Sequence, residues 1–186
     1  MRLILRAFAG VSFATMVAAA TAAQSPTLVF LVRHAEKAAM PADDPPLTPA
    51  GEARARALME VLEHASIGAI ISTPYARTRS TAAPIASQRG LSIETVAVAG
   101  GTAAHAQAVA AAVRRHTGKA VLVVGHSNTI NAIAAALGGP RLPDLCDEHY
   151  DQIFVLELSP TGESRFARTH YGAATPRGAC AQMQAR

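Results

Sequence analysis

The stretch LVFLVRHAEK, residues 28–37, is the starting point for the fold. Five apolar residues run without interruption and are followed at once by the ionisable side chains of Arg33, His34, Glu36 and Lys37. A short, continuous apolar run is typical of a strand that is buried on both faces of a parallel sheet. The abrupt change at Arg33 indicates either a strand that surfaces into water or the floor of an active site.

Segments of helical and strand character alternate along the rest of the chain. Further strands are expected at residues 67–72, 91–98, 119–128, 152–159 and 164–171. Helices are expected from Thr48, as an N-cap with Pro49 at the first helical position, to residue 65, and over residues 75–90 and 129–139. Residues 100–118 are expected to form a loop followed by an Ala-rich helix that Gly118 ends. This order predicts an α/β fold, a three-layer α/β/α sandwich whose mostly parallel sheet has an antiparallel edge. Pro84 is expected to kink or restart the second helix.

The N-terminus has the pattern of a secretory signal peptide. Arg2 and Arg6 precede a short apolar stretch, and small residues follow at a plausible cleavage point. The stretch is short for a membrane span of about 20 residues, which is the alternative. We therefore expect a cleaved signal peptide at residues 1–23, a single domain at 24–186, and a periplasmic or secreted protein without a stable membrane anchor.

The composition argues against a surface that binds nucleic acid. The chain has 17 basic and 13 acidic residues. Removal of Arg2 and Arg6 with the signal peptide leaves 15 basic residues and a net charge of about +2. No basic run with interleaved aromatic residues is present, so nucleic acid is not an expected partner. Nothing in the sequence indicates an oligomeric state.

Cys146 and Cys180 are the only cysteines. In an oxidising compartment a bridge between them is plausible, and it would stabilise the fold by about 3–4 kcal/mol in the chain-entropy model. Two unpaired thiols are the alternative. No spacing typical of metal ligands occurs near them, so no metal site is expected.

Three of the expected strands lead into reactive residues. The first ends in Arg33 and His34, the second leads through STPYARTRSTA to Arg77, and the fourth ends in GHSN with His126. The carboxyl ends of parallel strands share one sheet edge, where ligands bind in open α/β folds. Each residue alone has an ordinary structural explanation, and Arg79 is expected to be solvated. Their convergence favours a functional site.

Two arginines and two histidines suit phosphoryl chemistry. Arginine forks bind oxyanions bidentately and keep their proton. Arg33 and Arg77, with one of the two histidines protonated, would balance a phosphomonoester dianion. The other histidine, if neutral, could then attack phosphorus and form a phosphohistidine, by either ring nitrogen, without a metal ion or other cofactor.

At this point the sequence resembles the histidine phosphatase superfamily, in its phosphoglycerate mutase-like branch. LVRHAEK matches the Arg-His-Gly motif with Ala35 in place of glycine, STPYARTRSTA matches the Arg-x-x-x-Thr-Ala pattern, and VVGHSN matches the Gly-His motif. The resemblance implies a phosphoglycerate mutase-like fold with His34 as nucleophile. It also implies that Arg33 and Arg77 grip the phosphoryl oxygens and that His126 stabilises the transition state. Ser127 is expected to add a hydrogen bond to the substrate.

The proton donor is the departure from the family pattern. Mutase-like members place an acidic residue after the third strand, where this chain has AVAGGTAAHAQ. The other branch uses an aspartate at the position of Ser127. Three candidates stay open, namely Glu148, Glu36 and His105, which is expected in the loop where the usual acid is missing. Each has a surface role as the alternative.

The leading function is therefore an exported phosphatase, similar to histidine acid phosphatases, that hydrolyses small phosphomonoesters or a phosphoramidate. The small bacterial phosphohistidine phosphatases of the superfamily resemble it in size and also lack the usual acid. A mutase is less favoured, because the chain lacks long insertions over the site. The alternative from a different class is a non-catalytic protein that binds a phosphorylated ligand in the same cradle.

Overall fold

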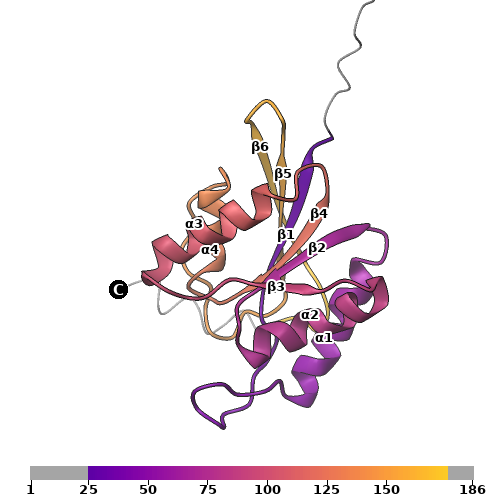
Figure 1. Ribbon diagram of the computed structural model, residues 1–186. Coiled ribbons are helices and arrows are strands. Elements are labelled where there is room, and N and C mark those ends of the chain that lie inside the picture. Colours follow the sequence, from indigo (N-terminus) through magenta and orange to yellow (C-terminus); the bar gives the residue numbers. More distant parts are fainter. Residues whose placement is uncertain (1–24, 176–186) are drawn as a thin grey trace, which may run out of the picture.

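The fold is a six-stranded sheet between two layers of helices, seen here in a computed structural model that describes residues 25–175 (Figure 1). The strands are β1 (Thr27–Arg33), β2 (Ile67–Ser72), β3 (Ile93–Thr95), β4 (Ala120–Gly125), β5 (Gln152–Leu158) and β6 (Ser164–His170). The helices are α1 (Pro49–Val61), α2 (Ala76–Arg89), α3 (Gly101–Arg114) and α4 (Ile130–Ala136). The strand order is β3-β2-β4-β1-β5-β6.

The sheet is parallel in one half and antiparallel in the other. β3, β2, β4 and β1 run parallel, whereas β5 pairs antiparallel with β1 and β6 antiparallel with β5. This arrangement confirms the expected three-layer sandwich with an antiparallel edge. It also places β1 and β4, which lead into the two histidines, side by side at the centre.

Alternating side chains of the central strands pack into two hydrophobic cores, one on each face of the sheet. Val29 and Leu31 of β1 point to the face covered by α3 and α4, and Val32 points to the face covered by α1 and α2 (Figure 1). This period of two is the geometry of a strand that is buried on both sides. The apolar run of β1 is therefore scaffold as far as Val32.

Two strands are shorter than the sequence pattern indicates. β3 covers only Ile93–Thr95 instead of residues 91–98, because it is an edge strand paired with β2 alone. β4 ends at Gly125, since the carbonyl of His126 already accepts the hydrogen bond from Ile130 at the start of α4. Thr48 caps α1 as expected, with its hydroxyl accepting from the Gly51 amide.

Pro84 does not restart the second helix. α2 is one continuous helix from Ala76 to Arg89, with Pro84 inside it. Proline leaves the carbonyl four residues earlier without its usual helical partner, and that residue, Ser80, is exposed. Water can therefore solvate this carbonyl, and the helix continues.

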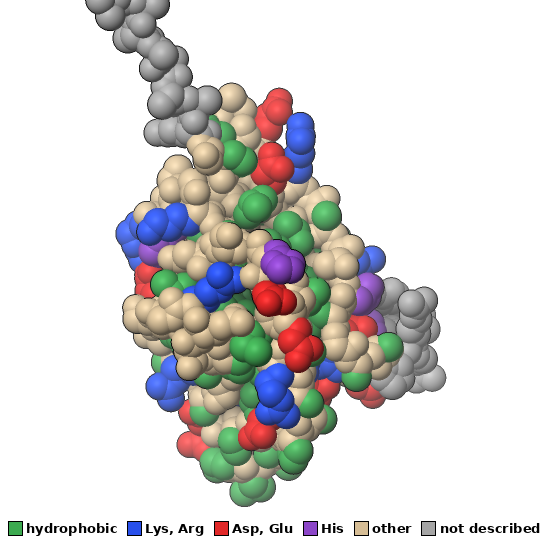
Figure 2. All heavy atoms as spheres, turned by 90° about the vertical axis from the view of Figure 1, so that its right-hand side faces the viewer, with side chains coloured by type: hydrophobic (Ala, Val, Ile, Leu, Met, Phe, Trp, Pro, Cys, Tyr) green, Lys and Arg blue, Asp and Glu red, His purple; other side chains and the backbone are tan. Residues whose placement is uncertain are grey.

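Two sequence predictions fall outside the described residues, namely the signal peptide at 1–23 and the cysteine at position 180. Export and the Cys146–Cys180 bridge therefore stay predictions. Within residues 25–175, no helix combines the length and the apolar character that crossing a bilayer requires. On the face shown in Figure 2, basic and acidic side chains are interspersed and neither sign forms a continuous patch.

Candidate active site

The ends of β1 and β4 bring the two predicted histidines together. Arg33 pairs with Gly125 across the two strands, and the His34 amide donates to the Gly125 carbonyl at 2.9 Å. The imidazole centroids of His34 and His126 are 5.4 Å apart. They line a cleft of about 600 Å³ together with Arg33, Arg77, Ser127, Lys37, Tyr75 and Asp147. A larger hollow of about 1000 Å³, between α1 and the β5–β6 hairpin, contains none of the predicted catalytic residues.

His34 is held neutral with one ring nitrogen free. Its Nδ1 lies 2.8 Å from the Ala35 carbonyl, which can only accept, so Nδ1 carries the proton and Nε2 keeps its lone pair. The pKa of His34 is lowered to about 3, mainly by burial and in addition by the charges of Arg33 and Arg77. The residue after His34 is also held in place, because the Thr81 hydroxyl accepts a hydrogen bond from the Ala35 amide at 2.9 Å. The ring is therefore oriented as a nucleophile at Nε2.

His126 is also neutral in the ligand-free protein. Burial and the nearby charge of Arg77 are the largest causes that lower its pKa to about 4. Its Nε2 lies 3.0 Å from the Thr73 hydroxyl, at the end of β2.

Arg33 is locked to the loop before β5. Its Nη1 donates to the carbonyls of Cys146 at 2.9 Å and Asp147 at 2.8 Å, and its guanidinium stacks on Tyr150 with 4.1 Å to the ring centroid. The Asp147 carboxylate lies 3.7 Å from Nη2. The Nε–H is buried and has no partner among the described residues. One donor of this guanidinium therefore stays available for an anion.

Arg77 is held in a similar way from the other side of the cleft. It stacks on Tyr75, with 4.3 Å to the ring centroid, and its Nη1 lies 3.7 Å from the Asp44 carboxylate. Asp44 also accepts from the Ala76 amide at 2.9 Å and so caps α2, whose N-cap residue Tyr75 supplies no side-chain cap. The Arg77 Nε–H is a second buried donor without a partner in the described part of the chain.

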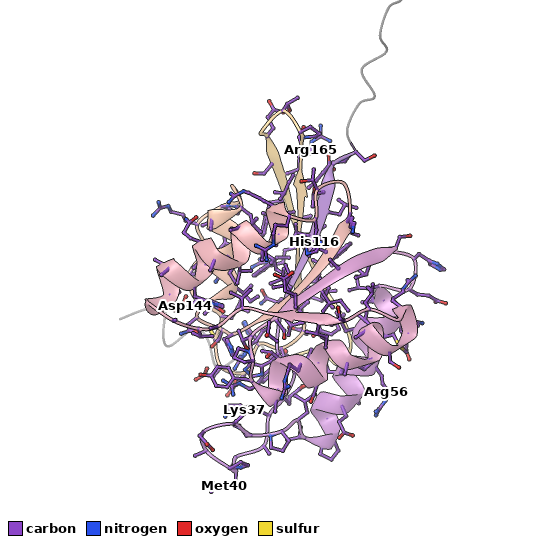
Figure 3. The ribbon with its side chains drawn as sticks, in the orientation of Figure 1. Lys37, Met40, Arg56, His116, Asp144 and Arg165 are labelled. Carbon is purple, nitrogen blue, oxygen red and sulfur yellow. The ribbon has the colours of Figure 1, made fainter. Side chains whose placement is uncertain are left out.

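Both buried donors indicate an anion site. An unsatisfied buried donor costs about 1–3 kcal/mol, and a bound oxyanion would remove that cost. With Lys37 the cleft carries three cations against the carboxylates of Asp44 and Asp147, which lie beside the two arginines. Figure 3 shows Lys37 where the loop of residues 38–48 begins, and Met40 far out on that loop. Phosphate, with its three terminal oxygens, matches this set of donors.

Glu36 belongs to a different structural unit. Its carboxylate accepts from Arg54 Nε at 2.9 Å and from Nη2 at 2.7 Å, and Arg54 is only 6% exposed. Arg54 also donates to the Tyr171 carbonyl at 3.1 Å. Glu36 does not line the cleft and instead ties the segment after β1 to α1.

The other two candidates for the proton donor are also outside the cleft lining. Glu148 is exposed to solvent. His105 lies inside α3 rather than in a loop, is 1% exposed, and its Nδ1 donates to the Ala97 carbonyl at 3.0 Å. The only carboxylate among the described residues that line the cleft is Asp147, one position before the predicted Glu148.

Sequence reasoning missed five residues of this site, namely Lys37, Thr73, Tyr75, Asp147 and Tyr150. Lys37, Thr73 and Tyr75 lie inside the quoted motifs, so a closer reading of those motifs could have found them. Asp147 and Tyr150 come from a loop without regular structure, and only the pairing of β5 with β1 brings that loop to Arg33.

No cluster of three or more His, Cys, Asp or Glu side chains within residues 25–175 could hold a metal ion. The cleft instead contains two guanidiniums, a neutral imidazole with a free Nε2, and a second imidazole beside it. This set can bind a phosphoryl group and attack it.

Comparison with known proteins agrees with this geometry. A sequence model of the histidine phosphatase superfamily (branch 1) matches residues 29–97, which hold the first two motifs. None of the curated proteins matches the sequence significantly.

Solved structures extend the similarity over most of the chain. A candidate phosphohistidine phosphatase, SixA of Nakamurella multipartitia, is 25% identical with a TM-score of 0.58, and the match covers 82% of this chain and 100% of that one. YhfR of Bacillus stearothermophilus is 21% identical with a TM-score of 0.62, over 76% of this chain and 95% of that one. A protein histidine phosphatase SixA, solved with tungstate, is 21% identical with a TM-score of 0.59, over 77% of this chain and 96% of that one. In its motifs, fold and sheet-edge cleft, the chain is similar to proteins of the histidine phosphatase superfamily (branch 1).

Proposed function

We propose that the protein is a phosphatase that hydrolyses phosphorylated compounds through a covalent phosphohistidine on His34. One observation carries this proposal. His34 is buried and neutral, its Nδ1 proton is bonded to the Ala35 carbonyl, and its Nε2 is free between two arginines. A protein that only binds phosphate needs no nucleophile prepared in this way.

In the first step the two arginines hold the phosphoryl oxygens and the Nε2 lone pair of His34 attacks phosphorus. The bond from phosphorus to the leaving atom breaks as the phosphorus–nitrogen bond forms. Phosphoryl transfer passes through a loose transition state, so positioning and charge stabilisation carry most of the catalysis. The hydrogen bond from Nδ1 to the Ala35 carbonyl stabilises the positive charge that develops on the ring.

In the second step water attacks the phosphohistidine. The phosphorus–nitrogen bond breaks, its electron pair returns to Nε2, and inorganic phosphate leaves. Arg33 and Arg77 keep their charge throughout, because guanidinium does not lose its proton at physiological pH. No metal ion is required for this sequence of steps.

The cleft further supports a substrate with a leaving group that needs little protonation. Glu36 and Glu148 do not line it, and the carboxylate of Asp147 is paired with the Arg33 guanidinium at 3.7 Å. Phosphoramidates such as phosphohistidine, and aryl phosphates, have such leaving groups. One of the similar structures is described as a candidate phosphohistidine phosphatase and another as a protein histidine phosphatase, which agrees with this class.

The decisive experiment is rapid quenching with a radiolabelled phosphatase substrate. We expect an acid-labile, base-stable phosphoryl adduct that disappears in His34→Ala together with turnover. The matched control is His64→Ala, because His64 is an exposed histidine outside the cleft. Turnover that survives in His34→Ala would refute the mechanism.

The same experiment tests the binding-protein alternative. Tight binding of inorganic phosphate with neither adduct nor turnover, on phosphoramidate and aryl substrates alike, would favour a non-catalytic role. For the substrate class, kcat/KM should fall steeply from aryl to alkyl phosphates, because the alkyl oxygen needs a proton as it leaves.

We also propose that the protein acts outside the cytoplasm after cleavage of residues 1–23. The basic start, apolar stretch and small residues of the N-terminus support this. Mass spectrometry of protein recovered from the periplasm or medium should give a chain that begins near residue 24. A full-length chain retained in the cytoplasm would contradict export.

A further inference from the structure

A chain of two buried threonine hydroxyls lies behind His126. The Thr73 hydroxyl is 3.0 Å from His126 Nε2 and 2.8 Å from the Thr78 hydroxyl. Thr73 is 1% exposed and Thr78 is 0% exposed, and neither lines the cleft. These hydroxyls therefore act on the ring from the protein interior and do not meet the substrate.

The surrounding carbonyls fix the direction of every proton in this chain. Thr78 Oγ1 lies 3.0 Å from the Thr73 carbonyl and 2.9 Å from the Tyr75 carbonyl. Both carbonyls can only accept, so the Thr78 hydroxyl donates its single proton to this pair of carbonyl oxygens. Thr78 Oγ1 must then accept the proton of the Thr73 hydroxyl. The Thr73 oxygen is left as an acceptor, so His126 Nε2 must be its donor.

We propose that Thr73 and Thr78 are positioning residues that hold the His126 proton on Nε2 and make Nδ1 the atom that takes up a proton when a phosphoryl anion binds. The inference rests on the proposed function, because it assumes that such an anion occupies the cleft. It adds to the expected role of His126 as a transition-state stabiliser, because it states which ring nitrogen carries the fixed proton and which takes up a proton on binding.

The physical reason is the lone pair on Nδ1. His126 lines the cleft while its Nε2 is turned to Thr73, and no hydrogen bond within the described residues reaches Nδ1. A bare lone pair repels an anionic oxygen, whereas a protonated Nδ1 donates to it. Turning the ring would not help, because the Thr73 oxygen would then lose its donor.

The neighbours of His126 oppose its charge until an anion arrives. Arg77 of α2, His105 of α3 and Arg33 at the end of β1 all lower its pKa, and it is about 4 in the ligand-free protein. His34 and Tyr75 contact the ring edge to face and supply no negative charge when both are neutral. A dianion on the two arginines reverses this balance, so binding at pH 7 should take up close to one proton.

The first test is nitrogen-15 NMR of the imidazole rings in the ligand-free protein. We expect the proton of His126 on Nε2 in the wild type and in Thr73→Ser, which keeps the hydroxyl. Thr73→Val, and more weakly Thr78→Val, should shift the ring toward a mixture of tautomers. The matched control is Thr27→Val, a buried threonine whose hydroxyl accepts from the Gly118 amide at 2.9 Å, far from the cleft.

The second test is calorimetry with tungstate in buffers of different ionisation enthalpy. The wild type should take up about one proton per tungstate at pH 7. Thr73→Val should bind tungstate about tenfold more weakly, a loss typical of residues that position a ligand-contacting side chain. Thr73→Ser keeps the hydroxyl and should bind it about as tightly as the wild type. Thr27→Val should match the wild type in both.

Two outcomes would overturn the inference. One is a wild-type His126 with its proton on Nδ1, which the wild-type spectrum decides even if a variant fails to fold. The other is tungstate binding without proton uptake. Neither measurement requires turnover, so a failed phosphohistidine test leaves this result standing, and a wrong tautomer leaves the His34 mechanism intact.

Discussion

The two neutral, buried histidines make stability strongly dependent on pH. His34 and His126 have pKa values lowered to about 3 and about 4, whereas an unfolded histidine titrates near 6.5. Between those values the unfolded chain binds more protons than the folded protein. Stability is therefore fully present above about pH 6.5 and is lost as the pH falls through the window from 6.5 toward 4.

The magnitude follows from the same values. At pH 5 an unfolded imidazole is about 97% protonated, while both folded rings are still mostly neutral. Each buried ring therefore lowers the free energy of unfolding by about 2 kcal/mol at pH 5 and by about 0.2 kcal/mol at pH 7, compared with high pH. Together they should remove about 4 kcal/mol between pH 7 and pH 5, a large part of the stability of an ordinary domain.

Urea unfolding at pH 7 and pH 5 measures this effect, in a buffer without phosphate. His34→Asn should lose about 2 kcal/mol less than the wild type over this pH interval, and the double variant with His126→Asn about 4 kcal/mol less. His64→Asn removes an exposed histidine and should lose as much as the wild type. Equal losses in wild type and double variant would refute the claim that these rings are buried and neutral.

Three further predictions concern the residues around the site. Arg54→Ala leaves Glu36 without its bidentate partner and should lower the free energy of unfolding by about 3 kcal/mol in urea titrations. Glu36→Gln should change kcat/KM for aryl and alkyl phosphates by the same factor. A selective loss on the alkyl substrate would instead make Glu36 the proton donor. Gly51→Ala would place a Cβ 2.2 Å from the Glu36 carbonyl oxygen, so α1 must shift, and denaturation should show a loss of about 1–3 kcal/mol; an unchanged melting temperature would contradict this close approach. Asp147→Asn removes the carboxylate beside Arg33 and should tighten tungstate binding about two- to fivefold, the effect expected of an exposed ion pair, whereas Asp144→Asn in the same loop should leave calorimetric affinity unchanged.

The sequence predicts the scaffold well, because its signals are local or periodic. The apolar run before Arg33 is buried on both sides, and Thr48 caps α1 as its position indicates. The sequence is less informative about the ends of elements. β3 is shorter than its apolar pattern because an edge strand has one partner, and Pro84 is tolerated because the carbonyl that it leaves unpaired belongs to an exposed residue.

The proton donor shows where sequence reasoning stops. Glu36 lies two residues from the nucleophile, yet its carboxylate turns to Arg54 on α1. Glu148 sits in the correct loop, but its neighbour Asp147 faces the cleft. Which side of a loop a carboxylate occupies depends on partners far along the chain, and spacing within a motif carries no information about them.

The order of strands and helices along the chain and the identity of the four residues at the sheet edge can be predicted from the sequence alone, because apolar periodicity and short motifs are local signals. The protonation of the two histidines among them depends on the packed structure. Burial and neighbouring guanidiniums keep both histidines neutral, and the Ala35 carbonyl and the Thr73 hydroxyl each bond one ring nitrogen. Desolvation and hydrogen-bond direction exist only once distant segments have packed together, and they leave Nε2 of His34 free to attack.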